Sequence, residues 1–284
     1  MIARAAIKSC CADLYASDWA RLLLGDSLHP GGAALTKRLG HLMGLEPGMR
    51  VLDVAAGRGA SAICLARELG CDVVGIDYGA ANVAAARLEA QAVGLDDRAA
   101  FAAGDAERLP CADGWFDAVI CECAFCTFTD KPAAAAELAR VLQPGGAVGI
   151  ADLVRRGRLP AGLDDLLAWI ACIADARPLE EYATHLTAAG LEVTTTEDHD
   201  PALIDLARTV RLRLMGARLV ARLKGVELPG SNLARAREMA RAAERAVVDG
   251  SLGYMLIVAR KPPAQMTREH VPNAAINERS SSRA

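Results

Sequence analysis

The chain lacks any apolar run long enough to cross a membrane. A membrane-spanning helix needs about 20 apolar residues in succession, and no stretch of the 284 residues offers such a run. The first residues, MIARAAIKSCC, are too short and too polar for the apolar centre of a signal peptide. We therefore expect a cytoplasmic protein that has no membrane partner.

The chain also lacks an excess of charge of either sign. It holds 32 Lys and Arg residues against 35 Asp and Glu residues, which gives a formal net charge of −3. Both signs are mixed along the predicted helices, so the sequence indicates no surface for nucleic acid. Hydrophobic residues make up 52% of the chain, which is typical of a globular protein with a full core.

Paired cysteines are not expected either. The nine cysteines are an odd number, and thiols in the cytosol stay mostly reduced. We therefore interpret these residues as buried small side chains or as ligands, rather than as a disulfide framework.

Strand and helix patterns alternate along the first half of the chain. Strands are predicted at 51–54, 72–76, 99–102, 116–121 and 147–151. Helices are predicted between them, at 59–69, 80–93 and 132–142. This alternation predicts a parallel sheet with helices on both faces. The region 152–252 is expected to be mostly helical, except for a strand at 191–196 that pairs with the last strand, 254–259.

The predicted fold class is α/β, a doubly wound, Rossmann-like sheet of seven strands with N-terminal helices and a helical C-terminal insertion. The N-terminal helices are expected at 10–26 and 32–44, in a helical cap that covers residues 1–45. The main domain is expected at 46–262, with the insertion at about 197–250. The polar tail, 263–284, is expected to be disordered.

A glycine-rich loop follows the first strong strand. It runs from Asp53 to Gly59, and its glycines allow the backbone to approach a ligand at the start of a helix. Gly57-x-Gly59-x-x-Ala62 also fits a dinucleotide fingerprint. The carboxylate of Asp53 would repel a pyrophosphate and attract an ammonium group, which favours S-adenosylmethionine, although an acid here can also brace the loop.

Two further acids follow the next strands. Asp77, followed by Tyr78, ends the second strand, where a carboxylate can accept hydrogen bonds from both ribose hydroxyls. Asp105 follows the third strand and can accept a hydrogen bond from an adenine amino group. The backbone amide of Ala106 can donate to the adenine ring.

Taken together, these motifs resemble those of class I S-adenosylmethionine-dependent methyltransferases. The matching segments are Asp53-x-Ala55-x-Gly57-x-Gly59, Asp77, Gly104-Asp105-Ala106-Glu107-x-Leu109-Pro110, Phe116-Asp117 and Leu142-x-Pro144-Gly145-Gly146. That family usually has glycine where this chain has Ala55. The resemblance implies S-adenosylmethionine as the cofactor, held by Asp53, Ala55, Gly57, Gly59, Asp77, Tyr78, Asp105, Ala106 and Cys121.

Three cysteines follow one another where the fourth strand ends. Cys121, Cys123 and Cys126 stand in the segment that faces the methyl group in the family that this chain resembles. Thiolates suit soft metals and metalloids. Free cysteine is also often a small core residue. With Cys172 the cluster could alternatively bind zinc, although structural zinc sites usually pair two Cys-x-x-Cys knuckles and only one cluster is present.

The same region resembles arsenite methyltransferases. Val119-Ile120-Cys121-Glu122-Cys123, the stretch from Ala171 to Ala176, Leu179-Glu180-Glu181-Tyr182 and Ala188-Ala189-Gly190-Leu191 carry this resemblance. It implies that Cys123 and Cys172 hold a trivalent metalloid, with Cys121 beside them as a catalytic residue. The chain departs from that family at Glu122, where asparagine is usual. It also departs in having only the vicinal pair Cys10-Cys11 as a counterpart of the family's additional cysteine.

The acceptor segment shows no convincing general base. His29 precedes Pro30-Gly31-Gly32 and could lie near the cofactor cleft, but a role in the turn is favoured. A thiolate-bound As(III) needs no base because it carries its own lone pair, whereas an oxygen acceptor normally needs one. Methylation of thiol-bound arsenite is therefore the first hypothesis. Further thiols of the chain, or a thiol reductant, could deliver the substrate or reduce the product by disulfide exchange. The alternatives are a C- or O-methyltransferase of the quinone-biosynthesis type and a non-catalytic protein that binds S-adenosylmethionine or a metalloid.

Overall fold

The computed structural model describes most of the chain between Lys8 and Ala264. The residues that it describes are 8–9, 12–13, 15, 17–25, 27–159, 173, 175–223 and 230–264. Cys10, Cys11 and Cys172, which the sequence analysis singled out, lie outside these residues, as does the predicted tail from 265 onward.

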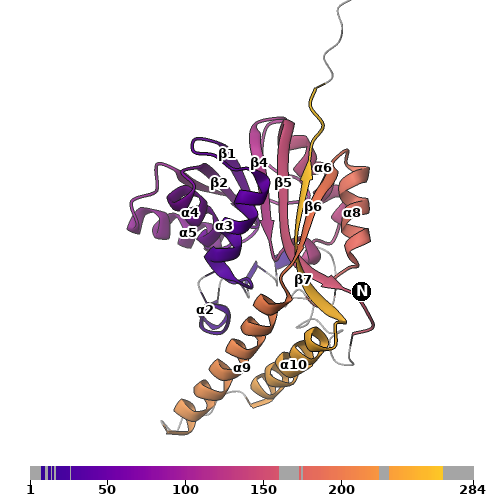
Figure 1. The fold of residues 1–284 in the computed structure, drawn as a ribbon. Coiled ribbons are helices and arrows are strands. Elements are labelled where there is room, and N and C mark those ends of the chain that lie inside the picture. The colour runs from indigo at the N-terminus through magenta and orange to yellow at the C-terminus, as the bar shows by residue number, and fades with distance from the viewer. Residues whose placement is uncertain are drawn as a thin grey trace, which may run out of the picture.

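A seven-stranded sheet forms the centre of the molecule, in the order β3-β2-β1-β4-β5-β7-β6 (Figure 1). Its strands are β1 Arg50–Val54, β2 Asp72–Asp77, β3 Ala99–Ala103, β4 Phe116–Glu122, β5 Leu142–Arg155, β6 Glu192–Asp198 and β7 Leu252–Arg260. The first five strands are parallel, and β7 runs antiparallel between β5 and β6. The predicted doubly wound α/β fold is confirmed, and so is the pairing of the last strand with the strand near residue 191.

Apolar runs explain why these segments form central strands. Val51, Leu52 and Val54 of β1 are completely buried, as are most side chains of β4 and β7. Strands buried on both faces are continuous apolar runs rather than alternating ones. The fifth strand extends beyond the predicted 147–151 at both ends: Leu142 pairs with Phe116 of β4, and β7 pairs with the stretch from Ala147 to Arg155.

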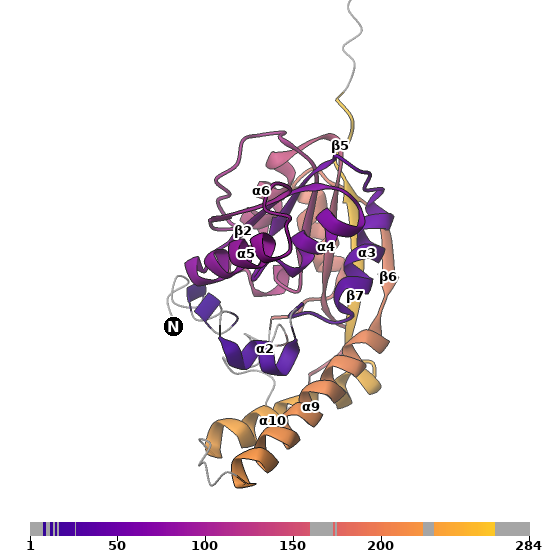
Figure 2. The ribbon, with the colours of Figure 1, turned by 90° about the vertical axis from the view of Figure 1, so that its left-hand side faces the viewer.

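Helices cover both faces of this sheet. They are α3 Gly32–Met43, α4 Ala60–Glu68 and α5 Ala80–Ala92 on one face, and α6 Lys131–Val141 and α8 Leu179–Ala188 on the other (Figures 1 and 2). The helix predicted at 10–26 is described as α2, Asp18–Leu24, which begins after Ser17 and ends at Gly25. The Ser17 side chain accepts a hydrogen bond from the Ala20 amide, as helix-capping serines do.

Two long helices extend away from the sheet. They are α9, Asp200–Leu223, and α10, Gly230–Val248, which follow β6 and precede β7 in the chain and pack against each other (Figure 2). This is the predicted helical C-terminal insertion. Helix α9 begins at the carboxyl end of β6 and contacts α2. Within the described ranges, no helix combines the length and the apolar character that a membrane span requires.

Candidate functional site

A pocket lies at the carboxyl ends of β1, β2, β3 and β4, where doubly wound folds bind ligands. Seven of the predicted cofactor residues line it: Asp53, Ala55, Gly57, Asp77, Tyr78, Asp105 and Ala106. Two other predicted residues, Gly59 and Cys121, do not line the pocket. Gly59 packs instead against the Phe101 ring, which an added Cβ atom would meet at 2.6 Å.

Three acids lie buried in the pocket wall, Asp53, Asp77 and Glu122, and two of them have an oxygen without a partner among the described residues. Asp53 is 2% exposed and Glu122 is 9% exposed. Oδ2 of Asp53 and Oε1 of Glu122 have no hydrogen-bond partner among the described residues. Burial raises the pKa of Asp53 well above its ordinary value, and the nearby charges of Glu122 and Asp77 raise it further. Two buried carboxylates that repel each other form a site with a strong demand for a cation.

Backbone and side-chain donors fix the position of the third acid, Asp77. Its Oδ2 accepts a hydrogen bond from the Gly57 amide at 2.8 Å. Its Oδ1 accepts from the Gly79 amide at 2.8 Å and from the Asn82 side chain at 3.0 Å. The acid at the end of β2 therefore holds the glycine-rich loop in place while remaining part of the pocket wall.

The fourth acid, Asp105, is in contact with the N-terminal segment. The Lys8 ammonium donates to both of its oxygens, at 2.9 and 2.7 Å, and pairs with Glu107 at 2.6 Å. Burial opposes the charge on Lys8, but the hydrogen bonds that the ammonium donates to Asp105 and Glu107 outweigh this effect and raise the pKa of the amine. The sequence analysis did not link residue 8 to this site.

Backbone strain gathers around this pocket. Leu28, Ala55 and Cys123 are the non-glycine residues with positive φ in the described part of the chain, at 57°, 61° and 53°. All three line the pocket. Such conformations cost about 1–3 kcal/mol each and gather at functional sites. At Ala55, a φ of 61° is a conformation that glycine would adopt at lower cost.

A compact polar network links Glu122 to His29. The Thr36 hydroxyl donates to Glu122 Oε2 at 2.9 Å, and the Ser61 hydroxyl donates to the same oxygen at 2.6 Å. His29 Nε2 lies 3.6 Å from that oxygen. The imidazole is 6% exposed and lines the pocket. His29 is therefore part of the pocket wall as well as of the turn that the sequence indicated.

The tautomer of His29 follows from its second nitrogen. Nδ1 lies 3.1 Å from the carbonyl oxygen of Pro30, which can only accept a hydrogen bond. The proton of the neutral ring must therefore be on Nδ1, so that Nε2 keeps its lone pair. Nε2 can therefore accept a proton, and it lies near Glu122 Oε2 and, at 3.5 Å each, the hydroxyls of Thr36 and Ser61.

The cysteines of the acceptor segment occupy different environments. Cys121 and Cys126 are completely buried, whereas Cys123 is partly exposed in the pocket wall. Burial raises the pKa of the Cys121 thiol well above its ordinary value, and the charges of Asp152 and Asp53 add to the effect. Cys121 is thus a protonated thiol behind the pocket. That Cys123 and Cys172 together hold a metalloid stays a prediction, since Cys172 lies outside the described residues.

Among the residues that the structure describes, no three His, Cys, Asp or Glu side chains gather as a metal site would require. Cys121, Cys123 and Cys126 are all included in that search. These three do not gather as zinc ligands would, and Cys172, the fourth thiol of that alternative, lies outside the described residues.

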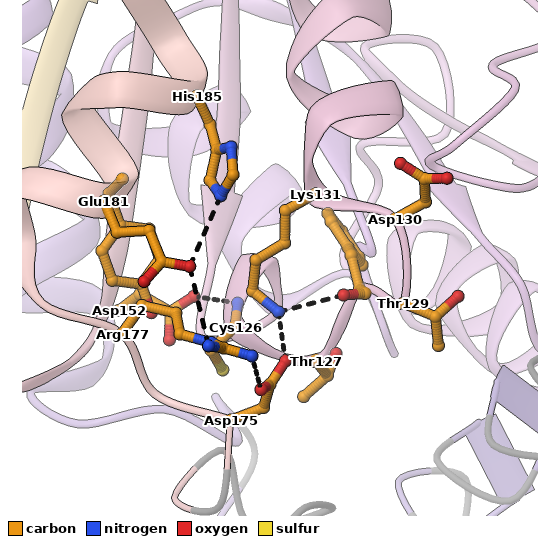
Figure 3. A network of polar contacts seen from close by, with 12 residues as sticks. Cys126, Thr127, Thr129, Asp130, Lys131, Asp152, Asp175, Arg177, Glu181 and His185 are labelled. Carbon is orange, nitrogen blue, oxygen red and sulfur yellow. Dashed lines mark hydrogen bonds and ion pairs between the residues drawn. The ribbon is translucent and has the colours of Figure 1, made fainter. Parts of the chain in front are cut away.

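A polar network holds the loop that follows β4 (Figure 3). Asp152 accepts a hydrogen bond from the Cys126 amide at 2.8 Å. The Lys131 ammonium donates to the Phe128 carbonyl at 3.0 Å and pairs with Asp175. Lys131 and Asp175 are both buried, which makes this ion pair part of the interior rather than of the surface. The loop that borders the pocket is therefore fixed at several points of its backbone.

Comparison with known proteins agrees with this geometry. Residues 45–198 match the model of a family described as a methyltransferase domain. The methyltransferase GfsG of Streptomyces halstedii is 34% identical over 61% of this chain and 63% of that protein. The 27-O-demethylrifamycin SV methyltransferase of Amycolatopsis mediterranei is 30% identical over 88% of this chain and 94% of that protein.

Solved structures show the same fold. A phosphoethanolamine N-methyltransferase 2 of Haemonchus contortus, in complex with S-adenosyl-L-methionine, has a TM-score of 0.72 at 20% identity. The similarity covers 92% of this chain and 57% of that one. At this level of identity the similarity concerns the fold alone.

Proposed function

The chain belongs to the class I S-adenosylmethionine-dependent methyltransferases, and from this membership we propose that it methylates a hydroxyl group of a small organic acceptor, with His29 as the general base. S-adenosylmethionine supplies a methyl group bound to a positively charged sulfur. The protein has to align the acceptor with that group, exclude water and remove the acceptor proton.

The pocket fits this cofactor. The unpartnered oxygens of Asp53 and Glu122 suit the ammonium group of its methionyl part. Asp77 stands where a carboxylate can accept hydrogen bonds from ribose hydroxyls. Asp105 and Tyr78 line the neighbouring part of the pocket, where they would border the adenine. These assignments repeat the sequence prediction and add Glu122 to it.

The observation that carries the proposal is the pair of His29 and Glu122. With Nδ1 engaged by the Pro30 carbonyl, Nε2 can take the proton of an acceptor hydroxyl, directly or through one water molecule. The imidazolium that results would face Glu122 Oε2, 3.6 Å away. Glu122 is thus the positioning residue that stabilises the protonated ring. The same base could serve a carbon acid such as a quinol ring.

Turnover with tritiated S-adenosylmethionine tests this mechanism against a panel of phenols, quinols and alcohols. His29→Ala should lower kcat by about 100-fold or more, the usual contribution of a general base. The affinity for S-adenosylmethionine should stay near wild type. His41→Ala is the matched control, because His41 is exposed on α3. A His29→Ala variant with wild-type kcat would remove the base from the mechanism.

Glu122→Gln tests whether the charge of Glu122 supports His29, apart from any effect of Glu122 on folding. It keeps the shape of the side chain and an acceptor for Ser61 and Thr36, but it cannot stabilise the imidazolium by charge. We expect kcat to fall while KM for the acceptor changes little, together with a change in the pH profile of kcat.

A second candidate acceptor is a thiol-bound trivalent metalloid such as arsenite. It is favoured by one observation, the thiol of Cys123 in the wall of the pocket. Thiolate-bound arsenic carries its own lone pair and would not use His29. None of the proteins compared above is described as an arsenite methyltransferase.

Arsenite supplied with glutathione distinguishes the two candidates. If the metalloid is the acceptor, Cys123→Ser and Cys172→Ser should each abolish its methylation, while His29→Ala should not. Cys111→Ser is the control, because Cys111 is a partly exposed thiol that does not line the pocket. Wild-type protein that ignores arsenite and methylates a phenol would exclude the second candidate.

A further inference from the structure

One part of the pocket is left over once the cofactor residues are assigned. It is lined by Tyr15, Leu28, Ala124, Thr127 and Phe128, which we call the acceptor wall. This wall presents aliphatic and aromatic surface. The Thr127 hydroxyl is already engaged, since it donates to the Ala124 carbonyl at 2.7 Å. The wall therefore offers shape and apolar contact rather than charge.

The aromatic part of the wall is rigid. The Phe128 ring meets the edge of the Phe125 ring, with centroids 5.6 Å apart and planes inclined by 64°. Phe125 is completely buried and lies 5.8 Å from the ring of Tyr182. The Tyr182 hydroxyl in turn donates to the Leu153 carbonyl at 2.8 Å. Three aromatic side chains in edge-on and tilted contact, with Tyr182 anchored at the far end, thus support the orientation of Phe128.

The backbone of the wall is fixed as well. Lys131 holds the Phe128 carbonyl, and Asp152 holds the Cys126 amide (Figure 3). Glu107 accepts hydrogen bonds from the Thr129 hydroxyl at 3.0 Å and from the following amide at 2.9 Å. An acceptor that stacks on Phe128 would therefore meet a preformed surface, which keeps the entropic cost of binding low.

The charges around the wall exclude acidic acceptors. Among the described lining residues, the permanent cations are Lys8 and Arg58. Lys8 is paired with Asp105 and Glu107, and Arg58 lies 3.8 Å from Glu89. The remaining charged groups of the lining are acids. A phosphate or carboxylate here would lose its hydration and face mainly acids, and each of the two cations already has an acid within 4 Å.

We propose that the acceptor wall binds an uncharged, ring-bearing hydroxy compound and rejects acceptors that carry phosphate or carboxylate. This inference rests on the proposed function and names the substrate class of the same pocket. The ring stacks against Phe128 and Leu28, and its hydroxyl lies toward His29.

A pair of matched probes tests the proposal by calorimetry on protein saturated with S-adenosylhomocysteine. 1-Naphthol carries the ring and a neutral hydroxyl, and 1-naphthyl phosphate carries the same ring with two negative charges. We expect 1-naphthol to bind and 1-naphthyl phosphate to bind at least about tenfold more weakly. Phe128→Ala should weaken 1-naphthol binding by about tenfold. Val93→Ala, an exposed apolar residue outside the pocket, should not change it.

Leu28→Gly is the second variant, in case Phe128→Ala disturbs the fold. Leu28 has a φ of 57°, so glycine relieves strain while it removes the side chain from the wall. Retained affinity for S-adenosylhomocysteine shows that the variant is folded, and its loss of 1-naphthol binding would support the proposal. Equal binding of the two probes, or variants that bind 1-naphthol like wild type, would overturn it. If 1-naphthol binds as expected but is not methylated, the proposed hydroxyl chemistry fails and the acceptor wall stands.

Discussion

Replacing Asp53 by asparagine tests the central electrostatic feature of the pocket. Asp53 is buried at the end of β1, with Oδ2 lacking a hydrogen-bond partner in the described structure and with a raised pKa. Asparagine keeps the shape and removes the negative charge, and with it the repulsion from Glu122 and Asp77. The variant should therefore be more stable than wild type and bind S-adenosylmethionine less well.

The size and sign of the stability change follow from this environment. An unpaired buried polar group costs about 1–3 kcal/mol, and a gain of 1 kcal/mol raises the Tm of a chain of this size by about 2–4 °C. The folded-state pKa of Asp53 lies above its unfolded value. Protonated Asp53 contributes fully to the folding stability at pH values below its pKa in the unfolded chain. This contribution is lost as the pH rises through its pKa in the folded protein. The advantage of Asp53→Asn should therefore be small at acidic pH and grow as pH rises.

The effect on the cofactor has the opposite sign. Loss of one charge-assisted hydrogen bond to the ammonium costs about 1.5–3 kcal/mol, which is a roughly 10- to 150-fold increase in Kd. A bound cation favours the ionised form of Asp53, so wild-type protein should release a proton on binding at pH values below the raised pKa. Asp53→Asn should bind without this release.

Two measurements on wild type and Asp53→Asn test the predicted changes in stability and in cofactor affinity. Thermal unfolding is followed at acidic and at mildly alkaline pH, and cofactor binding is followed by calorimetry in buffers of different ionisation enthalpy. A lower Tm for Asp53→Asn at alkaline pH would refute the stability argument. Unchanged affinity together with unchanged proton release would remove Asp53 from the ammonium site.

The remaining predictions concern the packing that supports the pocket. Gly59→Ala should destabilise the fold by about 1–3 kcal/mol, because Gly59 has a φ of +83° and an added Cβ would meet Phe101. Gly145→Ala is the comparison in urea unfolding, because Gly145 has a φ of +82° but an added Cβ would meet no atom within 4 Å. It therefore reports the backbone strain without the steric clash, and its loss of stability should be smaller. Lys131→Met should cost about 3 kcal/mol, because it leaves the buried Asp175 with one partner fewer. Lys37→Met, at an exposed ion pair, should cost less than about 1 kcal/mol, and equal losses for the two lysines would contradict the argument from burial.

The positions of the strands were predictable from the sequence because each is a short apolar run bounded nearby by glycine or another turn residue. The run from Arg50 to Val54 and the breaker at Gly145-Gly146 need no distant partner to be recognised. The full length of β5 was not predictable, since it depends on pairing with a strand about a hundred residues later. Its end at Arg155 is set by Leu252 of β7, which local patterns cannot reveal.

The acids at the ends of the first three strands could be placed at one edge of the sheet from the sequence, whereas the contact between His29 and Glu122 could not. Asp53, Asp77 and Asp105 each follow a strand in a recognisable motif, and each lines the pocket. His29 and Glu122 come together across more than ninety residues of sequence, so no local pattern joins them. One signal was available. Glu122 directly follows apolar residues of a buried strand, and an acid in such a position has to find partners in the interior.

The pocket combines features that each oppose folding. Asp53 and Glu122 repel each other in a buried wall, and Leu28, Ala55 and Cys123 hold strained backbones beside them. A sequence that is free to optimise stability would remove both features, because asparagine and glycine would each relieve part of the cost. A positively charged ligand would instead relieve the repulsion between the two acids and bind more tightly for that reason. The strained conformations would orient backbone groups toward such a ligand. The concentration of unfavourable features at one edge of an otherwise well-packed sheet is therefore itself an argument that this edge is the binding site. It also implies that stabilising substitutions at these residues should reduce ligand affinity.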